Sequence, residues 1–463
     1  MSTPIFWILL PLLVAGSGLL LLRYRWLLKW GGSALSLVLA LNAAFLPINE
    51  SFRFLFWDLQ ISDELLVFGR RFILSESDRP IVIILFALHF FWLLIYNPKD
   101  VPSHFVPISL AGIVLILTAY AVDPIFYGAL FFAFLALINI VLLSPPGSKP
   151  SPGVMRMLIY QILGMLFILF AAWLASWIEY NRGDQLMLSR SLLILALGFS
   201  FLLSIFPFFS WIPMVGEKNH PFLTGYLFNS YFLGVFLFGS RFIIEGGWLT
   251  SGMNLQTPLQ LAGVLMLGLG GLLAVFSTHL GRFTSALVIT GIGRSLLAFS
   301  LFAAGFPIYF GMVIVQAVAL GVWSLALSGL QSGLPDFELE SAAGAARQHP
   351  IISSGLLIGY FTLAGLPLLA GFPVYMALGT GLQDYFSWIN TGLVLGSLGL
   401  VVGGIRIFRT MLQDPVNNQA LTIGDRYDRA LIIALNILLA LLGFLPQLFF
   451  RVTRAITDLM IGL

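Results

Sequence analysis

The sequence contains no cysteine and few charged residues. Without cysteine it can form no disulfide framework, no cysteine-ligated iron–sulfur cluster and no thiolate nucleophile. Only 9% of the 463 residues are charged, and the net charge of +3 gives no reason to expect a nucleic-acid partner. The few histidines are scattered along the chain. We therefore predict no metal site, no cofactor and no catalytic centre within the chain itself.

What the sequence does contain is apolar residues, which make up 59% of it. A helix needs about 20 of them to cross a bilayer, and stretches of that length recur with short breaks. The pattern predicts an all-α polytopic membrane protein with about fourteen transmembrane helices. The predicted ranges are 4–22, 26–47, 80–97, 104–122, 124–143, 155–178, 189–210, 221–243, 258–278, 284–304, 308–330, 350–371, 387–410 and 429–449.

Basic residues in the loops predict the orientation. They are more frequent on the side of the first connection, near Arg23 and Arg25, than on the other side. Because basic loops stay in the cytoplasm, both termini are predicted to lie on the non-cytoplasmic side. Two segments fall outside the helices. Residues 50–79 alternate apolar and polar residues, which is typical of an extramembrane hairpin, and residues 450–463 form a short tail predicted to lie at the membrane interface.

Two predicted helices are interrupted by proline in similar surroundings. The seventh contains Pro207 within FPFFSWIP (206–213), and the twelfth contains Gly365, Pro367 and Gly371 within GLPLLAGFP (365–373). If helices 4–8 and 9–13 form two five-helix units, each broken helix is the fourth of its unit, and successive units of five must be inverted. Kinks that serve packing are the alternative. The predicted organisation is 1–103 (helices 1–3 and the hairpin), 104–243 and 258–410 (the two repeats), and 411–463 (helix 14 and the tail).

These broken segments resemble the antiporter-like family of membrane subunits. That family includes the L, M and N type subunits of complex I, multisubunit sodium/proton antiporters and membrane-bound hydrogenases. Residues 206–213, with Pro221 opening the next helix, resemble the family's FPFHxWLPDA…PxPVSALL, residues 365–372 resemble GLPPxAGF, and residues 280–282 resemble the start of LKRLLAYSSI. The resemblance covers most of the chain.

The resemblance implies a subunit of a proton- or sodium-translocating complex in a bacterial inner membrane. Its partners would be the bilayer, other membrane subunits and quinone-reducing or hydrogenase-like modules, as in an NADH-quinone oxidoreductase. Buried lysines, a glutamate and histidines carry the ion path in such subunits. At the matching positions this sequence has neutral residues: Ala133, Leu202, Phe209, Phe232, Gly291, Gly321 and Tyr375. Its lysines, Lys29, Lys99, Lys149 and Lys218, are all predicted to lie in loops.

Few polar side chains remain in the predicted spans. Arg294 lies about twelve residues from Arg282, roughly at mid-depth. It is either a remnant of an ion path or a structural or intersubunit contact. His89 is either a proton relay or a core residue. Asn139, Asn229 and Gln316 either bridge helices or support a wet cavity.

Three functions therefore compete. The first is a divergent antiporter-like subunit that serves as a scaffold, its usual lysines and glutamate lost. The second is an active proton- or sodium-translocating subunit whose path is rebuilt from Arg294, His89 and neutral polar groups. The third is an unrelated secondary transporter, for which paired broken helices also serve.

Overall fold

The structure is a computed structural model that describes most of the chain. The described residues are 3–45, 52–54, 57–59, 63–67, 69–144, 147–180, 185–245, 255–331, 334, 336–382, 387–414 and 426–461.

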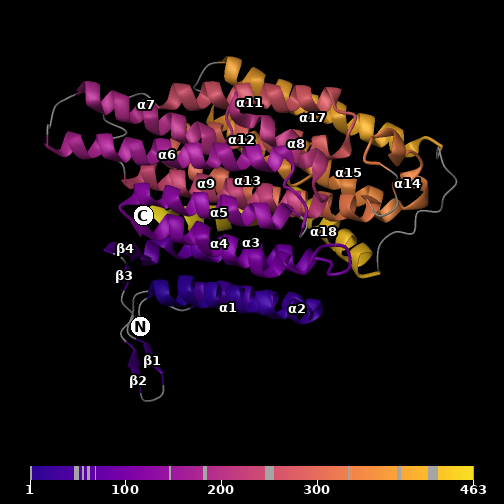
Figure 1. Cartoon of the computed structure of the whole chain (residues 1–463). Coiled ribbons are helices and arrows are strands. Elements are labelled where there is room, and N and C mark those ends of the chain that lie inside the picture. Colours follow the sequence, from indigo (N-terminus) through magenta and orange to yellow (C-terminus); the bar gives the residue numbers. More distant parts are fainter. Residues whose placement is uncertain are drawn as a thin grey trace.

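The protein is a bundle of long helices aligned along one axis (Figure 1). Both chain ends lie at the same end of the bundle, here called the termini side, and α14 (Ala345–Gln348) lies at the other, the opposite side. Nine of the described helices are long and apolar enough to cross a membrane. The predicted all-α polytopic class is confirmed, while the count of fourteen crossings stays a prediction.

Most long helices lie close to the ranges that hydropathy predicted, but the seventh and twelfth end early, at Leu202 and Ala364, and α16 lies almost entirely outside the predicted ranges. Those before the first broken segment are η1 (Ile5–Leu9), α1 (Leu10–Gly18), η2 (Leu19–Leu21), α2 (Arg25–Phe45), η3 (Glu76–Asp78), α3 (Arg79–Ile95), α4 (Phe105–Ala121), η4 (Ile125–Tyr127), α5 (Gly128–Leu143) and α6 (Pro152–Tyr180). The next helices in the chain, on both sides of the first broken segment, are α7 (Gln185–Leu202), η5 (Phe208–Ser210), α8 (Trp211–Lys218), α9 (Pro221–Glu245), α11 (Gln256–Phe276) and α12 (Leu280–Phe299). The remainder are η6 (Phe302–Gly305), α13 (Phe306–Gln331), η7 (Glu340–Ala342), α15 (Pro350–Ala364), α16 (Gly371–Gly381), α17 (Ser387–Leu412), α18 (Arg426–Phe444) and α19 (Pro446–Ile461).

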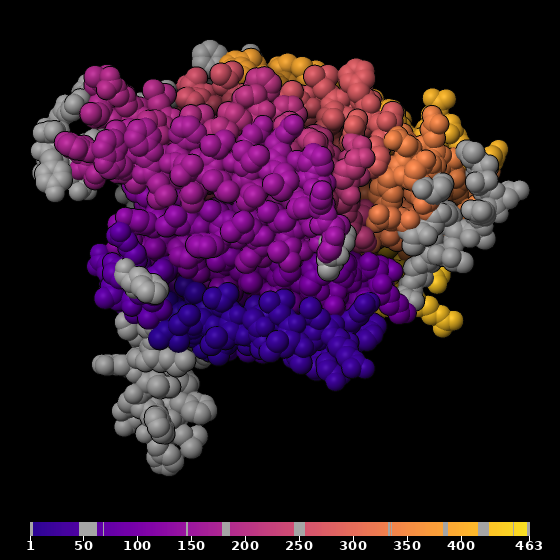
Figure 2. All heavy atoms as spheres, in the orientation of Figure 1, coloured from indigo at the N-terminus to yellow at the C-terminus, as the bar shows by residue number. Residues whose placement is uncertain are grey.

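The core of the bundle is formed around α9 and α13. In these two helices 83% and 89% of the residues in the most apolar stretch are buried. The corresponding share is 33% in α6 and in α17, which lie toward the outside. The α1–α2 pair forms a separate layer along one edge of the bundle, seen as the indigo band in Figure 2. Its outer face exposes leucines such as Leu13 and Leu20, as expected for a surface covered by lipid.

Two arginines bind helix ends in matching ways, one within residues 104–243 and the other within residues 258–410, which are called here the two halves of the chain. Arg241, near the end of α9, donates to the carbonyl oxygens of Tyr120 and Val122, where α4 ends. Arg406, near the end of α17, donates to the carbonyl oxygens of Val275 and Ser277, where α11 ends. In each half, the last helix therefore neutralises the carbonyl end of the first.

The predicted hairpin region forms short antiparallel strands. The strands are β1 (Phe52–Phe54), β2 (Trp57–Leu59), β3 (Glu64–Val67), β4 (Arg70–Ile73) and β5 (Val122–Asp123). β1 pairs with β2, and β3 pairs with β4. The sequence did not predict that β5, from the turn after α4, adds to β4, an arrangement supported by an ion pair of 2.9 Å between Arg71 and Asp123.

The tail forms a helix, α19, that was not predicted from the sequence, and the preceding helix ends at Phe444 and not at 449. α19 begins directly after α18 and packs against α13 and α3, and the side chain of Phe449 is buried beside Gly311. α19 is amphipathic, with Arg451 and Arg454 on its exposed face. The predicted position of this tail at the membrane interface stays a prediction.

Candidate functional site

The first helix break separates α7 from α8 and contains Pro207. Because proline has no N–H and the chain turns here, the last carbonyl groups of α7 lose their helical partners. The Leu202 carbonyl oxygen instead accepts a hydrogen bond of 2.9 Å from the hydroxyl of Tyr231 on α9. Ser204, at a φ of 57°, accepts a bond of 2.7 Å from the indole N–H of Trp211. Protein donors therefore bind the Leu202 carbonyl oxygen and the Ser204 hydroxyl of this break.

The second break separates α15 from α16 and is satisfied by Arg294. One guanidinium nitrogen donates to the carbonyl oxygen of Leu363, in the last turn of α15, at 2.5 Å, and another donates to the hydroxyl of Ser397 on α17 at 3.0 Å. The carbonyl end of a helix carries partial negative charge, so this is a favourable place for a cation. Arg294 is 1% exposed, and its Nε has no partner among the described residues.

The ring of Tyr375 covers one face of the Arg294 guanidinium. The Arg294 Cζ atom lies 3.8 Å from the ring centroid, a cation–π distance. Gly365 makes the break possible because its φ is +85°, and a Cβ atom there would lie 2.8 Å from the Tyr375 ring. Gly371 opens α16 so close to the Thr362 carbonyl that no side chain fits. Pro367 lies between these two glycines, in the break itself.

Asn229 and Gln316, far apart in the sequence, line one small cavity. It lies between α9, α12 and α13 and has a volume of about 20 Å³, enough for about one water molecule. Ser295 and Tyr309 also line it, and the Tyr309 hydroxyl has no partner among the described residues. Gly291, the position that matches a family histidine, lies in the same wall. The arrangement can bind a single water molecule between the two halves of the chain.

His89 is a bridge between three helices. Its Nδ1 lies 2.8 Å from the Ser36 hydroxyl on α2, and its Nε2 lies 3.0 Å from the Ser109 hydroxyl on α4. The imidazole is completely buried. Both ring nitrogens are thus occupied by neutral hydroxyl groups, which suits a core residue that fixes helix packing.

The other polar residues of the spans lie apart from these sites. Asn139 on α5 is buried, and its Nδ2 has no partner in the described part of the chain. The prediction that every lysine lies in a loop is wrong for Lys29, which lies in the second turn of α2 and is fully buried. Its ammonium group lies 4.5 Å from the ring centroid of Tyr427 on α18 and near Asp428, so aromatic rings and a carboxylate compensate its burial. The sequence could not indicate this contact, because almost the whole length of the chain separates α2 from α18.

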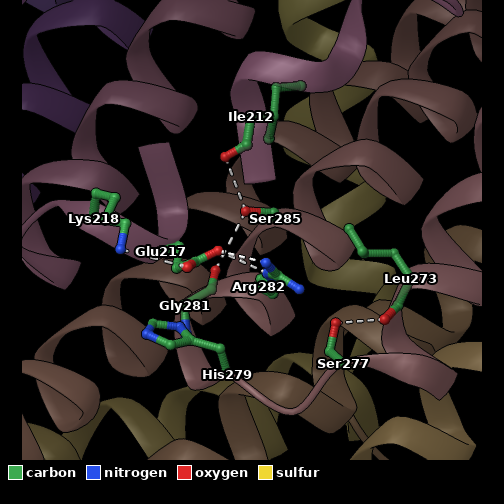
Figure 3. Close-up of polar contacts among 9 residues, drawn as sticks. All are labelled: Ile212, Glu217, Lys218, Leu273, Ser277, His279, Gly281, Arg282 and Ser285. Atoms are coloured by element: carbon green, nitrogen blue, oxygen red, sulfur yellow. Dashed lines mark hydrogen bonds and ion pairs between the residues drawn. The ribbon is translucent and has the colours of Figure 1, made fainter. Parts of the chain in front are cut away.

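A charged junction, drawn in Figure 3, joins the two halves. The Arg282 guanidinium, at the start of α12, donates to Glu217 Oε2, at the end of α8, at 2.8 Å, and the Lys218 ammonium lies 3.7 Å from Oε1. Burial favours a higher pKa for Glu217, but the hydrogen bond and charge of Arg282, with His279 and Lys218, hold that pKa below its usual value.

The backbones meet at the same junction. A Cβ atom on Gly281 would lie 2.0 Å from the Gly216 carbonyl oxygen, so the two helices approach as closely as glycine allows. The Ser285 hydroxyl donates to the Ile212 carbonyl oxygen at 3.1 Å and fixes α12 against α8.

Sequence comparison finds relatives among subunits of NADH-quinone oxidoreductases. No family model matches the sequence. The NADH-quinone oxidoreductase subunit N of Ectopseudomonas mendocina (strain ymp) is 26% identical over 342 residues, which cover 69% of this chain and 67% of the relative. The subunit N of Methylovorus glucosotrophus (strain SIP3-4) is 27% identical over 308 residues, which cover 64% of this chain and 62% of the relative. The match thus spans about three-fifths of the length of such relatives.

Solved structures share the fold over nearly the whole chain. A chain of the membrane-bound sulfane sulfur reductase (MBS), an archaeal respiratory membrane complex, superimposes with a TM-score of 0.79 at 16% identity, covering 99% of this chain and 97% of that one. The Mrp complex from Dietzia sp. DQ12-45-1b gives 0.77 at 13% identity, covering 99% and 97%. Respiratory complex I from Thermus thermophilus with bound Aureothin gives 0.73 at 17% identity, covering 96% and 98%.

Together, the fold and these relatives support an integral membrane protein. In sequence the chain is similar to NADH-quinone oxidoreductase subunit N, and in fold it is similar to membrane chains of the MBS, Mrp and complex I structures, in line with the resemblance of the motifs around both breaks.

Proposed function

We propose that the chain is a membrane subunit of a multisubunit ion-translocating complex of the complex I or Mrp type, in which it serves as a scaffold and does not conduct protons. The names of the subunit N relatives and of the MBS, Mrp and complex I structures support a place in such a complex. The expected partners are other membrane subunits, and a quinone-reducing or hydrogenase-like module is the expected source of redox energy. The expected location is a bacterial inner membrane, with both termini on the non-cytoplasmic side.

The observation that carries the scaffold role is how the two helix breaks are filled. A proton path needs side chains that exchange protons, and broken helices are where such paths bind ions or water. Here the Leu202 carbonyl is bound by Tyr231, and the Leu363 carbonyl is bound by Arg294 under the Tyr375 ring. Both breaks are therefore occupied by the protein's own donors.

The matching arginines of α9 and α17 support the proposed inverted repeats. Arg241 neutralises the end of the first helix of one unit, and Arg406 does the same in the other unit. Two inverted copies of one ancestral unit would place an equivalent contact on each side of the membrane. This supports repeats over residues 104–243 and 258–410.

The small cavity favours the second candidate, an active subunit with a rebuilt path. Asn229, Gln316 and Tyr309, all with polar groups in their side chains, line a space between the halves. A cavity of about 20 Å³ holds about one water, whereas proton transfer across a membrane needs several in series. The scaffold role is therefore the better supported of the two.

Proton flux distinguishes the two functions. The purified full-length chain is reconstituted into liposomes that contain a pH-sensitive dye, and a potential of about 100 mV is imposed with potassium and valinomycin. The scaffold role predicts flux equal to that of protein-free liposomes. Flux well above that level, abolished by Gln316→Leu and retained by the lipid-facing control Leu261→Phe, would overturn it and establish the rebuilt path. In parallel, native purification should recover the chain with other membrane subunits, and recovery of the chain alone would contradict a place in a complex.

A further inference from the structure

A cavity with almost wholly apolar walls lies where the two halves of the chain meet. Its volume is about 210 Å³, and it is enclosed by α7, α9, α11 and α12, with the start of η6. Among the described residues that line it, the only polar side chain is Ser200, whose hydroxyl donates to the Ala196 carbonyl oxygen of its own helix at 2.7 Å. The cavity therefore offers a ligand apolar contact and no side-chain hydrogen bond.

The cavity reaches the surface of the bundle at Ala196, and this point is called its mouth. Ala196 on α7 and Ala262 on α11 line it, and Ala196 is exposed. The leucines beside the mouth on the same helices, Leu193 and Leu261, are 59% and 61% exposed. Lipid that covers α7 and α11 therefore reaches the opening directly.

The floor of the cavity has room that a side chain of this protein could have filled. Gly239 lies there on α9, and a Cβ atom built on it meets only the Phe199 ring, at 3.5 Å, an ordinary contact. Aromatic rings, including Phe199, Phe236 and Phe242, and a larger number of aliphatic side chains form the remaining wall. Small residues at the mouth and on the floor therefore leave the cavity open between the larger side chains.

We propose that this cavity binds an acyl chain of a membrane phospholipid. Apolar cavities of about 150 Å³ stay free of water and take up apolar ligands, and an empty cavity deprives its walls of van der Waals contacts. The bilayer supplies acyl chains at the mouth, whereas the ring of a quinone would need polar partners that the lining lacks. This inference requires only that the chain lies in a bilayer, and it is independent of whether the subunit conducts protons.

Photolabelling tests the proposal directly. The purified complex that contains the full chain is placed in phosphatidylglycerol and phosphatidylcholine vesicles that carry a small fraction of phospholipid with a diazirine in its acyl chain. After illumination, labelled peptides are mapped by mass spectrometry. Label is expected on the cavity walls, at Phe199 and Phe236, as well as on lipid-facing residues such as Leu193. Label on lipid-facing residues with none on the walls would overturn the proposal, whether a neighbouring subunit or nothing occupies the cavity.

Two variants and a matched control identify the binding space. Ala262→Phe at the mouth and Gly239→Leu on the floor each place a large side chain in the cavity, while Leu261→Phe adds a ring on the adjacent lipid-facing position. Each filling variant is expected to lower wall labelling about tenfold, the loss expected when about two buried methylenes are displaced, and the control should label as the wild type does. Equal wall labelling in all proteins contradicts the proposal. If a filling variant fails to assemble, the wild-type labelling map still decides the question.

Retained lipid provides a second measurement. Native mass spectrometry of the complex in detergent should detect phospholipid that the wild type and Leu261→Phe keep and that the filling variants lose. Retention of an isoprenoid quinone in its place would reject a phospholipid as the occupant.

Discussion

At the scale of single residues, Arg294 shows how a buried charge is compensated without a carboxylate. Its guanidinium donates to the Leu363 carbonyl oxygen and the Ser397 hydroxyl and lies against the ring of Tyr375, all within the chain. Each of these groups lies on a different helix, so one side chain holds α12, α15, α16 and α17 together. Of the roles predicted for Arg294, the structural one therefore has the most direct support.

Replacement of Arg294 should destabilise the protein. Arg294→Leu leaves the Leu363 carbonyl oxygen buried without a donor, and we expect a loss of about 2 to 4 kcal/mol in the free energy of unfolding. The measurement is thermal unfolding of the purified complex, followed by tryptophan fluorescence. Arg190→Leu, which removes an exposed arginine from α7, is the control and should change stability little. A similar small effect for Arg294→Leu would mean that its contacts carry no stability.

At the scale of elements, the sequence predicted the helix breaks but not what fills them. Proline and glycine act on the backbone at their own position, so Pro207 and Gly365 are readable from the sequence alone. The donors are not readable, because packing brings them from elsewhere: Tyr231 is 29 residues from Leu202, and Arg294 is 69 residues from Leu363. For the same reason the sequence did not predict that Asn229 and Gln316 share a cavity.

The second break depends on the absence of a side chain at Gly365. Gly365→Ala must hold alanine at a φ of +85° and move the Tyr375 ring, so we expect a loss of about 1 to 3 kcal/mol in the free energy of unfolding. The control is Gly16→Ala in α1, where a Cβ meets nothing within 4 Å, and where alanine should be neutral or stabilise by up to about 1 kcal/mol. Thermal unfolding of both variants under the same conditions compares them. Equal midpoints would show that α15 can end without a glycine.

At the scale of the whole molecule, the two halves meet through backbone contact, the charged junction and the acyl-chain cavity. The all-α bundle, the two breaks and the likeness to antiporter-like subunits were predictable because they depend on hydropathy and local motifs. The way Arg241 and Arg406 each hold their own half was not, because each contacts a helix more than a hundred residues away. The buried position of Lys29 was mispredicted for the same reason.

The junction between the halves should weaken in acid. Because the pKa of folded Glu217 lies below the reference value of 4.5, its stabilising effect is complete above about pH 4.5 and is lost as the pH falls through the lowered value. Glu217 and Arg282 are partly exposed, so the contribution is about 1 kcal/mol or less. Unfolding midpoints between pH 7 and pH 3 should fall less steeply for Glu217→Gln than for the wild type. Glu340→Gln, at an exposed carboxylate, should follow the wild type, and an unchanged slope for Glu217→Gln would exclude this pair as an acid-sensitive link.

The single-water cavity beside Gln316 has an electrical consequence. A membrane complex that stores energy as a potential loses it through any part that conducts, and a solitary water with neutral neighbours gives a proton nowhere to go next. Next to conducting subunits, this chain would block proton leak across the membrane. Its contribution to the complex would be measured as a low leak and not as a rate of transport.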